Sequence, residues 1–290
     1  MAAERSETEA LTQAVLARLA DAPDPRLKTV MTALVRHLHD FVREVRLSEA
    51  EWAEAIRFLT ETGQRSDAKR QEFILLSDTL GVSMLVDALN RRWPAGATPS
   101  TVLGPFFVEG APELPDGANI MRGQGGLPAV VSGRVLASDG RPVAGASLDV
   151  WQTAPNGLYD VQDATQPEMN LRGRFLSRAD GGFRFRTVKP VSYPVPTDGP
   201  AGRMLRGLGR HAMRPAHIHF IVEAPGFERL TTHLFVAGDP YLDSDAVFGV
   251  KPALVVPFRG CEDAREAAAE GVSAPFCRID YDFRLVPLQK

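Results

Sequence analysis

The sequence is poor in the features that mark several common classes of protein. Its two cysteines, Cys261 and Cys277, are too few for a disulfide scaffold and lack the spacing of a thiolate metal site, so we interpret both as unreactive thiols. The formal net charge is −3 and no dense Lys/Arg tract is present, which argues against nucleic acid as a partner. No apolar run approaches the ~18 residues of a membrane-spanning helix, so a membrane protein is not expected.

The chain also begins without the pattern of a secretory signal. The opening segment MAAERSETEALTQAV carries acidic residues where such a signal is basic, and it lacks the apolar run. We therefore expect a cytoplasmic protein and disfavour a periplasmic or extracellular one. Hydrophobic residues make up 44% of the chain and charged residues 24%, which excludes a disordered or fibrous class.

What the sequence does contain changes in character near residue 95. Before this point apolar residues recur at helical spacing and predict one stripe on a helix over residues 27–45. A second helix begins at Ser48, where Glu51 completes a capping box. A third segment, from Asp67 to about Arg92, has apolar residues on more than one face, which predicts a buried helix that ends before Trp93-Pro94.

After residue 95 short alternating runs lie between Gly, Pro, Asn and Asp, which is typical of an all-β sandwich or barrel. Two β-prone runs flank Asp139-Gly140 and predict a hairpin. Later strands are predicted in RPAHIHFIVEAP, ERLTTHLFVAG and FCRIDYDFRLV. We therefore predict a mainly β protein with a helical N-terminal domain over residues 1–98 and a β-sandwich domain over residues 99–290.

The strongest local signal for chemistry is His217-Ile-His219. Side chains alternate across a strand, so both imidazoles face one side and could share a metal ion. Two hydrogen-bonded histidines on a polar sheet face are the alternative. His37 and His39 have the same spacing but lie within a predicted helix, where a turn of ~200° separates the two rings, so we interpret that pair as surface residues.

Two of the four tyrosines lie in turn-rich stretches near these strands. Tyr159 follows the run LDVWQ, and Tyr193 lies in VSYPVPTDGP. Loops on a rigid sheet often carry functional residues, although each tyrosine taken alone is as readily explained by packing. The case for them depends on the whole set of residues.

That set resembles the intradiol catechol dioxygenase family. The resemblance is carried by the succession GLYD, SYPVPTDGP, LGRHAMRPAHIHF and LTTHLFVAGDPYL, and the segment STVLGPFF and the helical N-terminal part also have counterparts, so it covers nearly the whole chain. It implies one Fe(III) per subunit, bound by Tyr159, Tyr193, His217 and His219. Phenolate oxygen is a hard, strongly donating ligand suited to iron(III), and two phenolates with one hydroxide would neutralise its three positive charges.

The resemblance also divides the chemical roles. Tyr159 and His217 would be equatorial ligands and His219 an axial one, whereas Tyr193 would leave the metal and act as a base towards the substrate. Arg214 matches the arginine of the family, and its permanent planar cation suits stabilisation of negative charge on the activated ring. A structural salt bridge is the alternative for Arg214.

His233 distinguishes the chain within the family. Catechol-type and chlorocatechol-type members carry glutamine at this point, whereas the hydroxyquinol-type members resemble this chain here and in the following GDPYLDSDAVFGVK. We therefore expect cleavage of hydroxyquinol (benzene-1,2,4-triol) by O2 to 3-hydroxy-cis,cis-muconate, the enol form of maleylacetate. The alternatives are a catechol or chlorocatechol 1,2-dioxygenase and, in another class, a non-catalytic β-sandwich that binds a metal or ligand.

The match to ILLSD and TVLGPF implies which residues line the substrate pocket. Among them, Asp78 would accept from the third hydroxyl of the substrate, or else lie on a helix surface or cap another segment, and Leu103 stands where relatives often have an aromatic residue. The expected lining is Leu75, Asp78, Val102, Leu103, Gly104, Pro105 and Phe106.

The helical domain has a further implication. Family members pair through it as homodimers, with an apolar tunnel that can hold a phospholipid-like molecule. The apolar segment from Phe73 to Leu89 is compatible with both, and ordinary core packing explains it equally well.

Overall fold

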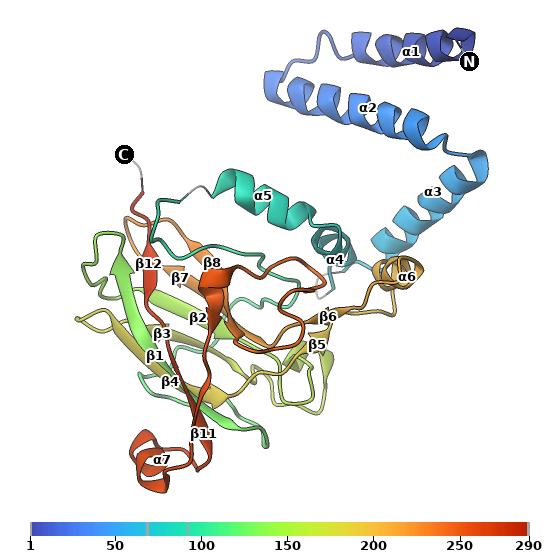
Figure 1. Ribbon diagram of the computed structural model, residues 1–290. Coiled ribbons are helices and arrows are strands. Elements are labelled where there is room, and N and C mark those ends of the chain that lie inside the picture. Colours follow the sequence, from blue (N-terminus) through green and yellow to red (C-terminus); the bar gives the residue numbers. More distant parts are fainter. Residues whose placement is uncertain (1, 68–69, 92, 289–290) are drawn as a thin grey trace. The chain divides into compact units, whose positions relative to one another are not determined.

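The computed structural model describes residues 2–67, 70–91 and 93–288 (Figure 1). The chain divides into two compact units, Met1–Thr60 and Glu61–Lys290. This division falls within helix α3 (Glu49–Gln64). The boundary after residue 98 between a helical domain and a β-sandwich domain stays a prediction.

The first unit is helical. Helices α1 (Ala2–Ala17) and α2 (Pro25–Val45) lie side by side (Figure 1), and Thr12 Oγ1 is 2.9 Å from His39 Nδ1. The carboxylate of Asp24 accepts backbone N–H groups of the first turn of α2, which satisfies donors that a helix start otherwise leaves open. A residue next to the helix in the sequence, Asp24, therefore sets where α2 begins.

The predicted apolar stripe is present on α2, but it faces outward. No residue of α2 is buried, and seven of its large apolar side chains are about half exposed. A single exposed apolar residue is ordinary, whereas a contiguous stripe marks a surface that another molecule covers. The exposed members are Leu27, Val30, Leu34, Leu38, Phe41, Val42 and Val45.

The next helices differ from the prediction in one respect. The capping box of α3 is confirmed, because Ser48 N–H donates to Glu51 at 2.8 Å. The single helix predicted over Asp67 to Arg92 is instead two, α4 (Glu72–Thr79) and α5 (Val82–Asn90), and residues 68–69 and 92 lie outside the described residues. Gly81, at φ +74°, breaks the helix in the left-handed region.

The expectation that this segment is buried was wrong for much of its surface. The segment has apolar side chains on more than one face, but only one face packs against the rest of the unit. Leu75 lies on that face and is buried. The outward side chains are between two-fifths and three-fifths exposed, because the helices cover the unit from one side only. They are Phe73, Ile74, Leu80, Val82, Leu85, Val86 and Leu89.

Two five-stranded sheets form the β-rich part of the second unit (Figure 1). In the first sheet the order is β10-β11-β1-β12, and β4 also pairs with β1. Its strands are β1 (Pro128–Ala137), β4 (Gly182–Val188), β10 (Arg259–Cys261), β11 (Phe276–Asp280) and β12 (Phe283–Leu285).

The second sheet has the order β3-β2-β7-β8-β9. Its strands are β2 (Ser147–Trp151), β3 (Arg172–Leu176), β7 (His217–Glu223), β8 (Leu230–Val236) and β9 (Val255–Val256).

The two sheets pack face to face, which confirms the predicted β-sandwich. Val131 and Phe185 of the first sheet join Phe220 and Leu234 of the second in one buried apolar core. Because side chains alternate along a strand, the other face of the second sheet remains available for polar residues. That outer face carries the candidate site.

The predicted turn at Asp139-Gly140 forms, since Gly140 N–H donates to the carbonyl of Ala137 at 2.9 Å. A short hairpin forms across it, because Leu136 pairs antiparallel with Pro142 and Val143 N–H donates to the carbonyl of Val135 at 2.9 Å. The pairing does not continue into β2, which belongs to the other sheet. The chain makes a short return after the turn and then crosses to the second sheet. The remaining elements are the ribbon β5 (Tyr193–Pro194) with β6 (Met213–Arg214), helices α6 (Pro200–Gly207) and α7 (Ala264–Glu270), and the 3-10 turns η1 (Asp160–Gln162) and η2 (Pro252–Leu254).

Candidate metal centre and active site

The outer face of the second sheet gathers three histidines. On β7, Ile218 and Phe220 point into the core, so His217 and His219 point outward. His233 of the neighbouring strand β8 lies opposite His219 in the antiparallel register. All three rings are buried, and their ligand atoms lie within 4.8 Å of one another. Alternation along β7 and its pairing with β8 therefore bring together three histidines that lie up to sixteen positions apart in the sequence.

Two tyrosines close over the outward histidines. Tyr159 precedes η1, and Tyr193 begins the short strand β5. Tyr159 Oη lies 3.0 Å from Tyr193 Oη and 3.0 Å from His219 Nε2. Tyr193 Oη lies 3.4 Å from His217 Nε2, and the two histidine Nε2 atoms are 3.0 Å apart. The structure thus brings the four predicted metal ligands into one closed ring of atoms, here called the ligand ring.

The spacing of the ligand ring fits a single metal ion. Two ligands that bind one ion at about 2.0–2.1 Å, with angles between 90° and 110°, lie about 2.9–3.4 Å apart. Every neighbouring pair in the ring falls close to this range. The donor set of two oxygens and two nitrogens suits a hard or borderline cation.

Hydrogen bonding fixes which nitrogen of His217 faces the ring. Its Nδ1 lies 2.6 Å from the carbonyl oxygen of Pro215, which can only accept, so Nδ1 carries the proton. In a neutral imidazole the lone pair is then on Nε2, the atom in the ligand ring. Burial lowers the pKa of His217 and of His219 well below the ordinary value, so both rings are neutral at physiological pH and able to bind a metal.

Burial shifts the pKa values of the two tyrosines upward, in the opposite direction to those of the histidines. Burial raises the pKa of Tyr159 well above 10, and the charge of Tyr193 adds to this effect. Burial likewise raises the pKa of Tyr193, although the charge of Arg214 opposes it. Both phenols therefore hold their protons until a cation in the ligand ring favours the phenolate form.

Arg214 lies beside the ligand ring. It stands opposite Tyr193 in the β5–β6 ribbon, and its Nη1 is 3.2 Å from His217 Nε2. Burial alone would lower the pKa of Arg214, but the charges of Asp245 and Tyr193 raise it above the ordinary value. A permanent cation therefore faces the site, paired on its other side with the buried Asp245.

His233 is a neighbour of the ligand ring. Its ring centroid lies 4.8 Å from that of His217 and 4.1 Å from that of His219. Within the described part of the chain, neither of its ring nitrogens makes a hydrogen bond of ordinary geometry, although the backbone of Val102 lies close enough to act on the ring as a weak acceptor. Burial lowers its pKa well below the ordinary value, so the ring is neutral and offers one donor and one acceptor to a bound molecule.

The structure brings most of the predicted pocket residues to this site. An alanine Cβ at Gly104 would lie 3.4 Å from His219 Cε1, and Phe106 stacks on Tyr159 at 4.6 Å between ring centroids. Pro105, between them, is half-buried. Leu103 is 40% exposed.

Leu75 and Val102 form a second group within the expected pocket. They belong to one buried apolar cluster that also contains Val247, a residue the sequence reasoning missed. Asp78 is buried nearby, and burial raises the pKa of its carboxyl, whereas a hydrogen bond from Ser83 and the charge of Arg214 act in the opposite direction. This excludes the alternative in which Asp78 lies on a helix surface.

The sequence reasoning also missed residues that support the ligands. Trp151 stacks on His219 with ring centroids 4.6 Å apart, in register across β2 and β7. Arg172 pairs with Asp160 at 2.7 Å, next to Tyr159, and its guanidinium lies 5.9 Å from the Tyr159 ring centroid. The alternating pattern of LDVWQ could have placed Trp151 on the outer face, but no local pattern indicates Arg172.

Other candidate residues lie away from the ligand ring. His37 is exposed on α2 and His39 contacts Thr12, as expected for a helical pair. Tyr241 packs near His211, and Tyr281 donates to the carbonyl of Ala253. Across the described ranges, every helix is too short or too polar to cross a bilayer.

Comparison with known proteins agrees with this geometry. The family model described as Dioxygenase matches residues 102–287, and the model described as Catechol dioxygenase N terminus matches residues 24–98. The chain therefore belongs to the intradiol ring-cleavage dioxygenases, a family of enzymes that use iron, as its motifs predict.

Within that family, hydroxyquinol-type proteins are highly similar to this chain. Hydroxyquinol 1,2-dioxygenase of Rhizobium sp. is 53% identical over 94% of this chain and 93% of its own. The 6-chlorohydroxyquinol 1,2-dioxygenase of Cupriavidus pinatubonensis is 53% identical over 96% of each chain. A crystal structure of hydroxyquinol 1,2-dioxygenase from Pseudomonas putida, also 53% identical, superposes with a TM-score of 0.90 over 98% of this chain and 100% of that one.

Proposed function

We propose that this chain is an iron(III) dioxygenase that cleaves hydroxyquinol between its two adjacent hydroxyl groups. O2 supplies both oxygen atoms that enter the product, 3-hydroxy-cis,cis-muconate, the enol form of maleylacetate. The observation that carries the proposal is the ligand ring, four buried donor atoms spaced for one metal ion with Arg214 and His233 beside them.

One Fe(III) per subunit would be held by Tyr159, Tyr193, His217 and His219. The two neutral imidazoles and two phenolates, with one hydroxide, balance three positive charges, so the buried centre carries no net charge. When bound there, iron(III) would supply Lewis-acid chemistry that activates the aromatic diol towards O2.

The residues around the metal have distinct tasks. Tyr193 is proposed to leave its place when the substrate binds, and because burial raises its pKa, its oxygen then takes a substrate proton. Tyr159, His217 and His219 stay as ligands. Arg214 holds its charge at every physiological pH and stabilises negative charge that develops on the substrate ring.

The choice of hydroxyquinol depends on two polar residues at the pocket. His233 offers ring nitrogens that make no hydrogen bond of ordinary geometry in the described chain, and Asp78 offers a buried carboxyl on α4. A site built around buried polar groups favours the substrate that satisfies them, because a ligand without the third hydroxyl leaves one unpaired. The names of the three hydroxyquinol-type proteins compared above support this choice.

Two alternatives remain distinct from this proposal. A catechol or chlorocatechol 1,2-dioxygenase would use the same ligand ring with a different pocket preference. A non-catalytic metal-binding sandwich would need the histidines but not Arg214 or a second tyrosine. The presence of all four ligand atoms and a buried cation favours an enzyme.

Oxygen uptake by the purified, iron-loaded protein tests the function and the substrate together. We expect faster specific turnover of hydroxyquinol than of catechol or 4-chlorocatechol, and a red-brown colour from phenolate-to-iron charge transfer. Faster turnover of catechol would overturn the choice of substrate. A colourless protein with stoichiometric zinc would overturn the iron assignment.

The role of Tyr193 has its own test. Tyr193→Phe removes one phenolate, so part of the charge-transfer absorption should disappear and turnover should be suppressed. The matched control is Tyr241→Phe, which changes a tyrosine outside the ligand ring. Unchanged turnover of Tyr193→Phe would refute the role of this residue as a departing ligand and base.

The helical part is proposed to form the contact of a homodimer and to hold a phospholipid-like molecule. The exposed apolar stripe of α2 supports a covered surface in the assembled protein. Organic extraction of the purified protein followed by mass spectrometry tests the lipid, and an extract without lipid would contradict it. The cytoplasmic location expected from the sequence stays a prediction.

A further inference from the structure

The guanidinium of Arg214 has two differently engaged edges. On one edge Nε lies 3.1 Å from Asp245 Oδ1 and Nη2 lies 3.4 Å from Asp245 Oδ2. On the other edge Nη1 faces the ligand ring, 3.2 Å from His217 Nε2. Both side chains are almost fully buried. The planar group is therefore held by one carboxylate in the rotation that aims Nη1 at the site.

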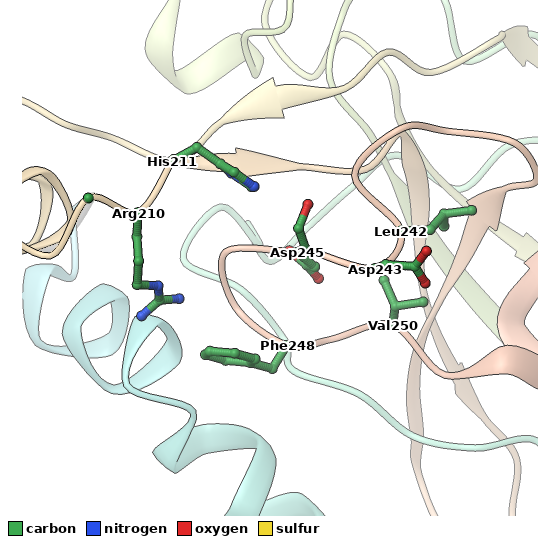
Figure 2. A pocket seen from close by; sticks show the side chains of 9 residues that line it. Arg210, His211, Leu242, Asp243, Asp245, Phe248 and Val250 are labelled. Carbon is green, nitrogen blue, oxygen red and sulfur yellow. The ribbon is translucent and has the colours of Figure 1, made fainter.

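Asp245 is itself fixed by its own loop. Its Oδ1 accepts the backbone N–H of Val247 at 3.3 Å, and its Oδ2 accepts the N–H of Gly249 at 3.0 Å. Figure 2 shows Asp245 and Asp243 on this loop, on the wall of a cavity of about 530 Å³ that Arg210 and His211 also line. The same loop carries Val247, which packs with the pocket residues Leu75 and Val102. The carboxylate thus links the pocket wall to Arg214.

Gly249 leaves room for this arrangement. A Cβ at this position would lie 3.1 Å from Arg214 Nη2 and 3.2 Å from Asp245 Oδ2. These contacts are tighter than ordinary van der Waals separations, so any side chain here would press on the ion pair. Gly249 is not among the glycines of the described chain that have a positive φ, so its backbone does not require the left-handed region. Close approach is therefore the reason for glycine here.

We propose that Asp245 is a positioning residue for the ring-cleavage reaction and acts through Arg214. This inference rests on the proposed function. Asp245 neutralises one edge of the guanidinium and fixes its rotation, so that Nη1 faces the place where negative charge develops on the substrate. Asp78 is another buried carboxyl, close enough for the charge of Arg214 to oppose the rise in its pKa, so we expect the guanidinium to reorient towards it when Asp245 is replaced.

The test compares Asp245→Asn with Asp243→Asn, two carboxylates of one loop. Asp243 is exposed and does not contact Arg214 in the described structure. Asp245→Asn should keep its iron and its charge-transfer colour, because Asp245 contacts no ligand of the metal. Its kcat per bound iron should fall roughly 10- to 100-fold, as expected for misplacement on the order of 1 Å, with a smaller change in KM. Asp243→Asn should match the unaltered protein.

A double-mutant cycle tests whether Asp245 acts through Arg214. In the background of Arg214→Gln, adding Asp245→Asn should lower kcat no further. Melting temperatures of the iron-free variants should likewise be non-additive, because either single change leaves a buried charge without its partner. Additive losses in kcat would mean that Asp245 acts independently of Arg214 and would overturn the proposal.

Gly249→Ala provides a second variant that retains both charges. It should lower kcat per iron in the same way as Asp245→Asn, and it decides the question alone if Asp245→Asn does not fold. Unchanged kcat per iron, or loss of iron from Asp245→Asn, contradicts the positioning role. Absence of turnover in the unaltered protein with every diol tested would instead contradict the proposed function, so the two failures are distinguishable.

Discussion

In the unit Met1–Thr60 the apolar side chains of α2 lie on the surface, whereas in Glu61–Lys290 polar side chains of β7 lie in the interior. Each arrangement costs free energy in an isolated chain. An exposed apolar stripe is stabilised when another molecule covers it, and a buried cluster of histidine and phenol groups is stabilised when a cation binds. The two units therefore suit two different kinds of binding partner, another molecule with an apolar surface and a cation.

The two His-x-His pairs make the same comparison on a smaller scale. His217 and His219 lie on a strand, and their Nε2 atoms meet at 3.0 Å. His37 and His39 have identical spacing on α2, where one is exposed and the other contacts Thr12. Identical sequence spacing thus brings two ring nitrogens together on one backbone and leaves two separate side chains on the other.

Exchanging both strand histidines should have the largest effect. His217→Asn with His219→Asn removes half of the ligand ring, so iron should be lost and turnover should fall by more than about 10³-fold, because a Lewis acid contributes several kcal/mol to such a reaction. Metal analysis and oxygen uptake measure both quantities. The control is His37→Asn with His39→Asn, which should retain iron and kcat per iron. Equal losses in both double variants would remove the distinction between strand and helix.

Charges placed in the apolar stripe should have an intermediate effect. Leu34→Glu with Phe41→Glu should convert the proposed dimer to a monomer, since each apolar side chain buried in an interface contributes roughly 1.5–3 kcal/mol and a charge reverses that contribution. Sedimentation velocity measures the state. Arg36→Glu, an exposed change on the same helix, should leave the dimer intact. If the unaltered protein is already a monomer, the proposed dimer contact through α2 is wrong.

The smallest effect is expected at Asp78, where burial raises the carboxyl pKa. Such a group stabilises the fold fully only below its unfolded pKa of about 3.9, and this contribution is lost as pH rises through the folded pKa. At pH 7, Asp78→Asn should therefore raise the melting temperature by about 2–4 °C, equivalent to about 1 kcal/mol. The gain in melting temperature should shrink as pH falls towards 4.

The same variant, Asp78→Asn, should also lower the preference for hydroxyquinol over catechol about tenfold.

Glu72 provides the matched contrast on the same helix. It is fully buried like Asp78, but Arg70 pairs with it at 2.8 Å. Glu72→Gln leaves that cation with a weaker partner and should lower the melting temperature at pH 7. A melting temperature of Asp78→Asn that falls as well would show that the Asp78 carboxyl is paired rather than held at a cost.

Local patterns predicted the features that depend on local geometry. The strand period placed His217 and His219 on one face, and the capping box placed the start of α3. Tyr159 and Tyr193 lie 34 positions apart and became candidates only as members of a family motif. Their meeting depends on how loops return over the sheet, which no short-range period encodes.

Other features depend on tertiary contacts and escaped prediction. The turn after β1 closes a short hairpin, yet β1 finds its other partners in β4, β11 and β12, and β2 pairs in the other sheet. Gly81 breaks a helix whose apolar pattern continues across it. Asp245 is one acidic residue among several in GDPYLDSDAVFGVK, and only its contact with Arg214 distinguishes it.

The short β5–β6 ribbon has a consequence for the timing of ligand exchange. His217 and His219 belong to a strand with neighbours on both sides, whereas Tyr193 belongs to a ribbon of two residues per strand. Local opening of such a small hydrogen-bonded element requires far less free energy than opening a central strand. The proposed departure of Tyr193 would therefore need only this ribbon to open, while the central strand of the sandwich keeps its register and holds His217 and His219 in place.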